Sequence, residues 1–439
     1  MTKYRFEEIL LTGGWQTDQV VSLGEDGRIA DIAPAAPDCA LPVVRGIAVP
    51  GLPNLHSHAF QRAMAGLAER AGPGADSFWT WRQVMYGFLE TLGPDDVERI
   101  ATGLYGEMLK AGYTSVAEFH YLHHAPDGSR YANIAEMSER IAAAASATGI
   151  GLTLCPVLYA HGGFGGTAPN EGQRRFINDA DNYLDLLEGA SRAIAERDGC
   201  RLGIAPHSLR AVTGELLDRV LADSQGITES GPVHIHISEQ EKEVEDCLAW
   251  SGARPVEWLL DHADVDERWC LVHATHVTES ERRKIAASGA VAGLCPTTEA
   301  NLGDGLFPIV DYHAEGGAWG IGSDSHISVS PVEELRWLEY GQRLVRRGRN
   351  LVSAGPGSST GRTLYDAALA GGARALGQNV GRLATGCRAD IVVIDRDAPT
   401  IAGRSGDEAI DSWLFAGNQN PVRDVMAGGR WVVRDGELA

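Results

Sequence analysis

The chain has 439 residues, 44% of them hydrophobic and 53 of them glycine, which is too long for one ordinary domain and too apolar for a disordered or fibrous protein. A formal net charge of −21 disfavours binding to nucleic acid or to anionic lipid, so neither is expected as a partner. The seven scattered cysteines form no C-x-x-C pair, and the N-terminus does not resemble a signal peptide. These features predict a cytoplasmic protein with reduced thiols.

Short β-strands are predicted at both ends of the chain. The apolar runs that indicate them lie at 9–11, 20–23, 28–32, 389–395 and 422–433. Neither end is long enough to bury a core alone. We therefore expect residues 1–48 and 378–439 to pair as one discontinuous β-sandwich domain.

The central part of the chain alternates apolar runs with helical patterns. The runs lie at 47–55, 114–119, 151–159, 201–206, 232–237, 270–274, 291–295 and 318–323. Eight buried strands with helices between them predict that residues 49–377 form a (β/α)8 barrel, the catalytic domain. Two helix boundaries support this spacing: a helix from Pro94 to Lys110 that ends at Gly112, and one that begins at Thr278.

A histidine pair, His56 and His58, stands at the end of the first predicted barrel strand. Side chains two residues apart on a strand point to the same face, so both imidazoles are available to one ligand. His236, His273 and Asp324 stand at the ends of later strands. Because barrel enzymes place their chemistry at the carboxyl ends of the strands, these side chains should meet at one rim.

Three imidazoles and one carboxylate suit Zn(II), with Fe(II) as a competitor. We assign the ligands as His56, His58, His236 and Asp324. A binuclear site needs a bridging group such as a modified lysine, but none of the four lysines ends a barrel strand, and strand four ends in His207. One metal ion per chain is therefore expected, with a water molecule whose pKa the metal lowers.

Glu239 lies three residues after His236, close enough to exchange a proton with such a water. The alternative is a solvated acid at the start of the acidic stretch 239–243. His273 is expected to hydrogen-bond the water or the developing charge rather than to bind the metal.

Further polar residues follow the predicted strands and could contact a substrate. His207 and Arg210 follow strand four, Tyr121 ends strand two, and Gln61 follows the histidine pair by three residues. The alternative for each is an ordinary packed or surface side chain. The same alternative applies more strongly to the histidines near Tyr121, at 120, 123 and 124.

Three segments and the C-terminal strands carry a family resemblance. The segment 381–395 resembles the closing β-domain signature of the amidohydrolase superfamily, and segments 55–62, 118–124 and 295–305 are similar to the formimidoylglutamate deiminases within it. The resemblance covers nearly the whole chain.

The resemblance implies hydrolysis of N-formimino-L-glutamate to N-formyl-L-glutamate and ammonia, a step of histidine degradation. It also implies one zinc ion, a cytosolic location and a homodimer. Carried over by position, it implies the same four metal ligands and assigns proton handling and charge stabilisation to Glu239, His273 and Asp324. The implied substrate contacts are Gln61, Arg82, Tyr121, His207 and Arg210. Two arginines, Arg82 and Arg210, suit a dicarboxylate substrate inside an acidic protein.

Two other functions remain open from the sequence. The same fold could deaminate a heteroaromatic ring such as guanine or cytosine, in a pocket that stacks the ring and needs no paired arginines. The second alternative is a non-catalytic barrel that serves as an assembly partner. Such proteins usually lose metal ligands, whereas this chain keeps the full set.

Overall fold

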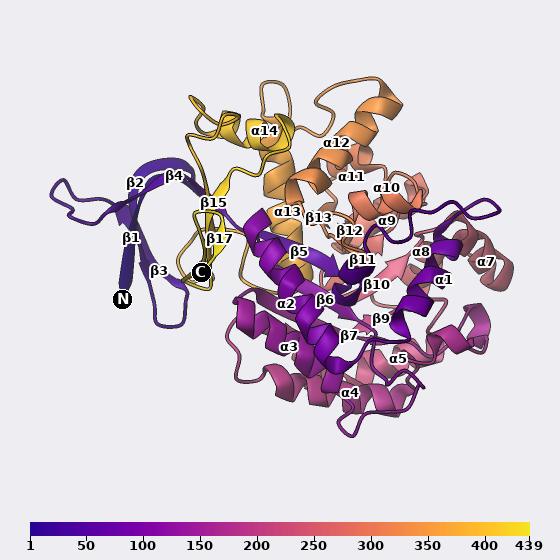
Figure 1. Ribbon diagram of the computed structural model, residues 1–439. Coiled ribbons are helices and arrows are strands. Elements are labelled where there is room, and N and C mark those ends of the chain that lie inside the picture. The colour runs from indigo at the N-terminus through magenta and orange to yellow at the C-terminus, as the bar shows by residue number, and fades with distance from the viewer.

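The computed structural model describes residues 1–439 and contains a parallel barrel beside a second, mainly antiparallel sheet (Figure 1). The barrel strands are β5 (Leu52–Ser57), β6 (Tyr113–His120), β7 (Gly151–Leu158), β8 (Cys200–Leu202) with β9 (Ala205–Pro206), β10 (Val233–Ile237), β11 (Trp269–His273), β12 (Val291–Leu294) and β13 (Ala318–Ile321). Parallel bridges from Ile204 to Val233 and from Ser57 to Asp324 close the ring. The predicted α/β barrel is thus confirmed.

The first predicted strand, 47–55, is divided between two sheets. Residues 47–50 belong to β4 (Val43–Pro50), which pairs with strands of the second sheet, and only β5 enters the barrel. Gly51 separates them and packs tightly on Thr114, since a Cβ atom on Gly51 would lie 2.2 Å from Thr114 Cγ2. An apolar run alone does not reveal this crossing, because both halves are buried.

Helices surround the barrel (Figure 1). They are α1 (Phe78–Leu89), α2 (Pro94–Ala111), α3 (Glu136–Thr148), α4 (Ala180–Ile194), α5 (Gly214–Asp223), α6 (Gln225–Thr228), α7 (Glu241–Ser251), α8 (Pro255–His262), α9 (Glu279–Ser288), α10 (Pro296–Leu302), α11 (Ile309–Ala314), α12 (Pro331–Arg346), α13 (Thr360–Leu376) and α14 (Asp407–Phe415), with short 3-10 turns η1 (Ala59–Met64), η2 (Phe164–Gly166) and η3 (Glu171–Gln173). The helix α14 packs outside α12 and α13, and α1 contributes residues to the wall of a cavity. None of the helices combines the length and the apolar sequence needed to cross a lipid bilayer.

Both predicted helix boundaries are confirmed. Gly112 ends α2 with a φ of 103°, a left-handed conformation that favours glycine. Thr278 caps α9, because its hydroxyl accepts a hydrogen bond from the backbone N–H of Glu281 while the Glu281 carboxylate accepts one from the backbone N–H of Thr278.

The two chain ends share one sheet. Its strands, in hydrogen-bonded order, are β17 (Glu437–Leu438), β16 (Arg430–Arg434), β15 (Val422–Ala427), β14 (Ile391–Ile394), β4, β1 (Thr2–Leu11), β2 (Gly14–Leu23) and β3 (Ile29–Pro34). The parallel pairing of β1 with β4 and the antiparallel pairing of β4 with β14 join the N-terminal to the C-terminal strands. A two-layer sandwich is not confirmed, because the strands follow a single hydrogen-bonded path.

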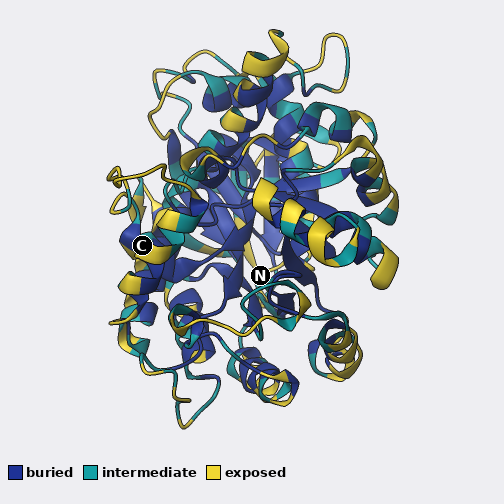
Figure 2. Cartoon of the chain, turned by 90° about the vertical axis from the view of Figure 1, so that its right-hand side faces the viewer, coloured by how far each residue is buried: buried dark blue, intermediate teal, exposed yellow.

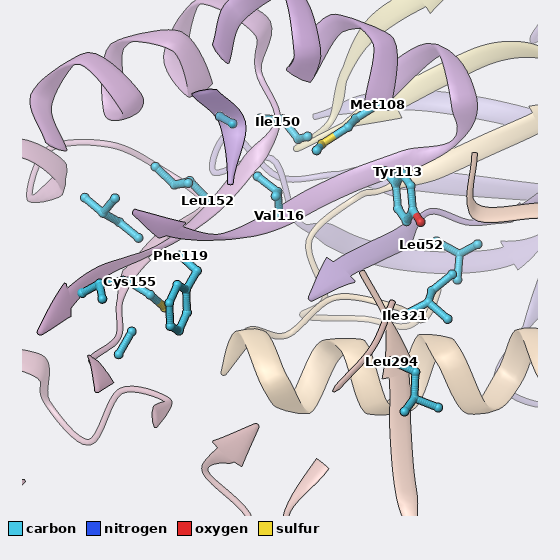
Figure 3. Packing of buried hydrophobic residues seen from close by; sticks show 14 of the residues in the cluster. Leu52, Met108, Tyr113, Val116, Phe119, Ile150, Leu152, Cys155, Leu294 and Ile321 are labelled. Carbon is cyan, nitrogen blue, oxygen red and sulfur yellow. The ribbon is translucent and has the colours of Figure 1, made fainter. Parts of the chain in front are cut away.

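The main core lies between the barrel strands and their helices. All residues of β5, β6 and β7 are buried, as expected for a parallel sheet covered on both sides, and buried residues dominate the centre of the molecule in Figure 2. Leu52, Val116 and Leu152 contribute to this packing (Figure 3). A smaller separate cluster, which includes Phe6 and Ile391, supports the second sheet, and all seven cysteines are free.

Candidate active site

Four predicted metal ligands converge at the carboxyl ends of the barrel strands. His56 lies in β5, His58 directly follows it, His236 lies in β10, and Asp324 follows β13. One donor atom from each lies within 4.8 Å of all the others, and all four residues are buried. The Nε2 atom of His56 is 3.2 Å from that of His58 and 2.9 Å from that of His236, and Asp324 Oδ1 is 3.2 Å from His58 Nε2.

These distances fit a bound metal ion. Zinc–nitrogen bonds of about 2.0–2.1 Å in a tetrahedral shell place neighbouring donors roughly 3.3 Å apart. His58 Nδ1 donates a hydrogen bond to the carbonyl of Phe119 at 2.8 Å, and His236 Nδ1 donates one to the carbonyl of His207 at 3.2 Å. Both bonds leave the Nε2 lone pair free for a metal. Burial lowers the pKa of His56 and of His236 well below the usual range, which favours the neutral form that binds metals.

The residue between the two β5-associated histidines points the other way. Ser57 Oγ donates to the buried carboxylate of Glu118 at 2.5 Å and lies 3.1 Å from His326 Nε2. The Glu118 carboxylate also accepts a hydrogen bond from the backbone N–H of Ala59, at 2.7 Å. These contacts fix the end of β5 to β6 on the face opposite the two histidines. Alternation along a strand explains why His56 and His58 are free to face the rim.

The chain bends sharply where it leaves the strands near this centre. Ser238, His273 and Asp324 adopt φ values of 50°, 69° and 48°, a conformation that side-chain-bearing residues seldom adopt. Each follows or ends a barrel strand. Such strained positions persist where the surrounding structure determines them, and they are common at functional sites.

Glu239 and His273 meet beside the four ligands. Glu239 Oε1 lies 3.7 Å from His273 Nε2, which lies 3.8 Å from Asp324 Oδ2. Burial raises the pKa of Glu239, which suits a group that both accepts and donates a proton. Burial lowers the pKa of His273, but the carboxylates of Glu239, Glu299 and Asp324 outweigh burial and raise it to about 10.

A cavity opens onto this centre. Its wall contains His58, His236, Glu239, His273 and Asp324. All five predicted substrate contacts also line it: Gln61, Arg82, Tyr121, His207 and Arg210. The structure therefore brings every site residue predicted from the sequence to the wall of one cavity except His56, which lies behind the wall with the other three predicted ligands, while their roles remain predictions.

Arg210 is a buried cation that lacks a complete set of partners. Its Nη2 atom lies 3.6 Å from Glu239 Oε2 and 3.8 Å from Glu243 Oε2, and neither Nη2 nor Nε makes a hydrogen bond within the chain. Arg210 also lies against the ring of Trp79, at 5.8 Å from its centroid. A buried guanidinium with free donors suits an anionic ligand.

Arg82 comes from α1 and is half-buried. Its Nη2 donates a hydrogen bond of 2.8 Å to the hydroxyl of Tyr159. The guanidinium also lies 5.7 Å from the ring centroid of Trp79 and 5.3 Å from that of Tyr86. These contacts hold a positive charge at the cavity wall.

The remaining predicted contacts form two smaller groups. Gln61 Nε2 donates to the hydroxyl of Tyr121 at 2.7 Å, and that hydroxyl donates to Met85 Sδ at 3.3 Å. Gln61 Oε1 is buried without a partner, so it can accept an N–H of a ligand. Burial, together with the charges of Arg210 and Arg82, lowers the pKa of His207 and favours a neutral imidazole.

The sequence interpretation missed several contributors. Glu299 contacts His273, Glu243 accepts hydrogen bonds from the backbone of Ser238 and Glu239, and Tyr86 and Tyr159 line the cavity. By contrast, the histidines at 120, 123 and 124 bond to backbone carbonyls, as packed residues do. Two of these four carried a signal: Glu299 lies in a segment similar to known enzymes, and Tyr159 ends the predicted strand 151–159.

A parallel α/β barrel with three imidazoles and one carboxylate at its carboxyl rim defines a metal-dependent hydrolase. The chain belongs to the amidohydrolase family, whose model matches residues 47–432. Members of this family depend on a metal, and the site described above supplies the ligands for one.

Individual relatives point to a narrower group. A formimidoylglutamate deiminase of Pseudomonas aeruginosa is 58% identical over 433 residues, which cover 99% of this chain and 95% of that protein. A crystal structure of an amidohydrolase from Brucella melitensis is 50% identical with a TM-score of 0.93, covering 100% of this chain and 96% of that one. An 8-oxoguanine deaminase of Pseudomonas aeruginosa is more distant, at 28% identity over 94% of this chain and 89% of that protein.

Proposed function

We propose that the protein hydrolyses N-formimino-L-glutamate to N-formyl-L-glutamate and ammonia, as a step of histidine degradation. The observation that carries this proposal is the pair Arg82 and Arg210, which line the cavity that also contains the metal-ligand set. A dicarboxylate provides a partner for each arginine. The 58% identity to a formimidoylglutamate deiminase supports the same substrate.

The metal in this proposal is one Zn(II) per chain, held by His56, His58, His236 and Asp324, with Fe(II) as the competing metal. When bound, zinc supplies Lewis-acid activation of a water molecule near neutral pH. The donor set contains imidazole and carboxylate but no thiolate, which suits a zinc centre of the hydrolytic kind.

The residues beside the metal handle protons. Glu239 takes a proton from the attacking water and delivers it to the imine nitrogen, while the oxygen adds to the formimino carbon. His273, held positive by the surrounding carboxylates, stabilises the negative charge that develops on that oxygen, and Asp324 stabilises the imidazolium. The proton of the added hydroxyl then passes through Glu239 to the same nitrogen, the carbon–nitrogen bond to that nitrogen breaks, and the carbon–oxygen double bond of the formyl group forms, so one water is consumed and one ammonia leaves.

The cavity wall orients the substrate. Arg82 and Arg210 bind its carboxylates, and the free Oε1 atom of Gln61 accepts a hydrogen bond from the amidine. Tyr121 and His207 line the same space and complete the contacts. A protein with a net charge of −21 repels a dianion at long range, but these contact charges act where water is excluded and screening is weak.

Deamination of a heteroaromatic ring is the competing function. Phe78, Trp81 and Phe176 in the cavity wall could stack on a ring. A neutral ring without a carboxylate, however, leaves Nε and Nη2 of Arg210 without the charged hydrogen-bond acceptor that a dicarboxylate supplies. The test is release of ammonia by purified, zinc-loaded protein from N-formimino-L-glutamate, compared with guanine, 8-oxoguanine, cytosine and adenosine. Efficient turnover of a ring substrate alone would replace the proposal.

We further propose that residues 49–377 form the catalytic domain and that residues 1–48 and 378–439 form the second domain. The protein is proposed to act in the cytoplasm as a homodimer on a small-molecule substrate, without nucleic acid or membrane partners. Light scattering of the purified protein tests the homodimer.

A further inference from the structure

Two tyrosines that the proposed reaction does not use, Tyr86 and Tyr159, line the same cavity as the arginines. Tyr86 is 8% exposed and comes from α1, whereas Tyr159 is 4% exposed and directly follows β7. Each brings a polar O–H group into a largely desolvated wall. Buried hydroxyls normally have a hydrogen-bond partner, so a hydroxyl without an acceptor for its proton indicates a ligand that accepts it.

The hydroxyl of Tyr159 accepts two hydrogen bonds. Arg82 Nη2 donates to it at 2.8 Å, and Gln173 Nε2 donates to it at 2.7 Å. Both nitrogens can only donate, so both lone pairs of the oxygen are used. The proton of Tyr159 has no acceptor among the protein atoms around it, and the residue lines the cavity.

The hydroxyl of Tyr86 makes no hydrogen bond that meets the usual geometry, and the Arg82 guanidinium beside it can only donate, so the Tyr86 proton has no acceptor in the chain. Its ring is held firmly: a Cβ atom added to Gly172 would lie 2.5 Å from Tyr86 Cδ2, and Arg82 packs on the ring at 5.3 Å. Leaving a hydroxyl buried and unpaired is unfavourable. A ligand that accepts its proton removes that cost.

These donors occur together with an incompletely paired cation. Arg210 has two free nitrogens, Nε and Nη2, and Arg82 is tied to both tyrosines by a hydrogen bond and a cation–π contact. The wall therefore contains several free donors, and its two carboxylates, Glu239 and Asp324, lie beside His273 at the metal-ligand set. A carboxylate has two oxygens that only accept, and it matches such a wall better than any neutral group.

We infer that Tyr86 and Tyr159 are substrate-binding residues that donate their O–H groups to one substrate carboxylate beside Arg82. This inference rests on the proposed function and deepens it, because it assigns the selection of a carboxylate to neutral donors as well as to arginines. Directional O–H donors discriminate against a substrate analogue in which an apolar group replaces the carboxylate, because the two hydroxyls then stay buried and unpaired.

The test is the variant Tyr86→Phe, with Tyr340→Phe on the exposed face of α12 as the matched control. Tyr86→Phe removes only an oxygen without a partner, so the midpoint of thermal unfolding should stay the same or rise. For N-formimino-L-glutamate, kcat/KM should fall by roughly tenfold to a hundredfold, the scale of a hydrogen bond to a charged group. Unchanged kcat/KM in Tyr86→Phe overturns the inference.

Tyr159→Phe should lower kcat/KM at least as much, because it also removes the acceptor that holds Arg82. Two truncated substrates then identify the bound group: N-formimino-L-norvaline lacks the side-chain carboxylate, and 4-formimidamidobutanoate lacks the α-carboxylate. The loss of kcat/KM caused by Tyr86→Phe should disappear with the substrate that lacks the carboxylate bound by Tyr86, and should persist with the other. An equal loss with both means that the hydroxyl binds no carboxylate and overturns the inference.

Calorimetric binding of glutarate separates this inference from the proposed function. If wild-type protein binds glutarate and Tyr86→Phe weakens that binding about tenfold or more, the carboxylate site stands even when no ammonia is released. If wild-type protein releases ammonia but both proteins bind glutarate equally, the proposed function stands and the inference fails.

Discussion

Glu299 Oε1 lies 3.3 Å from Nδ1 of His273, and the same oxygen accepts a hydrogen bond of 2.9 Å from the backbone nitrogen of Cys295. Glu299 is 3% exposed and lies in α10, one barrel strand away from His273. The carboxylate thus fixes one side of the imidazole while Nε2 faces Glu239 and Asp324. Glu299 acts through His273 and is a positioning residue in the proposed reaction.

We expect Glu299→Leu to lower kcat by at least about tenfold, because the imidazole loses both its orientation and a stabilising charge. Glu299→Gln keeps an acceptor for Nδ1 and should lose less. The pH profile of kcat provides the second readout, since loss of the carboxylate lowers the pKa of His273 and should move the falling limb to lower pH. Exposed Glu188→Gln is the control; equal profiles for Glu299→Leu and wild type would remove Glu299 from the mechanism.

Glu239→Gln keeps the shape of the side chain and removes the proton carrier. The rate constant kcat should fall by roughly a hundredfold or more, the usual scale for a positioned acid or base. Metal content, measured by inductively coupled plasma mass spectrometry, should stay near the wild-type value because Glu239 is not among the four ligands. Retention of most activity would show that another group moves the proton.

Replacement of Arg210 or Arg82 by Met should weaken kcat/KM for N-formimino-L-glutamate by on the order of 2 kcal/mol or more, since a charge-assisted contact is lost and a carboxylate is left unpaired. Arg210→Met should have a further effect, because Arg210 lies near Glu239 and lowers the pKa of that carboxyl. Its removal should raise the pKa of Glu239 and shift the rising limb of the pH profile upward. Wild-type kinetics in both variants would contradict the proposed substrate.

Removal of the metal should abolish activity, and one equivalent of Zn(II) per chain should restore it. Metal binding should also raise the midpoint of thermal unfolding, because only the folded chain brings the four buried ligand side chains together. His236→Ala is the matched variant and should lose both responses. Two tightly bound ions per chain in the active enzyme would contradict the mononuclear assignment.

Much of the fold could be predicted from the sequence because its signals are local. Buried parallel strands appear as apolar runs, and capping residues such as Thr278 and Gly112 identify helix ends. The division of the run 47–55 could not be predicted, because both sheets bury their share of it. The single path of the second sheet likewise depends on pairing between β4 and β14, which are more than 300 residues apart in the chain.

The convergence of the four predicted metal ligands could be anticipated from the sequence, because barrel geometry brings the ends of the strands to one rim. The roles proposed for Glu299 and Tyr86 could not be predicted in this way. Glu299 reaches His273 only because α10 follows β12 closely, and Tyr86 reaches the cavity only through the placement of α1. Neither residue type carries a signal of its own, since buried acids and tyrosines occur throughout the chain.

The most direct test of the central claim is the steady-state rate of ammonia release from N-formimino-L-glutamate by the zinc-loaded protein, with guanine, 8-oxoguanine, cytosine and adenosine in parallel. The account predicts efficient turnover of N-formimino-L-glutamate, formation of N-formyl-L-glutamate in equal amount, and little release from the ring compounds. Turnover of a ring compound without turnover of N-formimino-L-glutamate would contradict it.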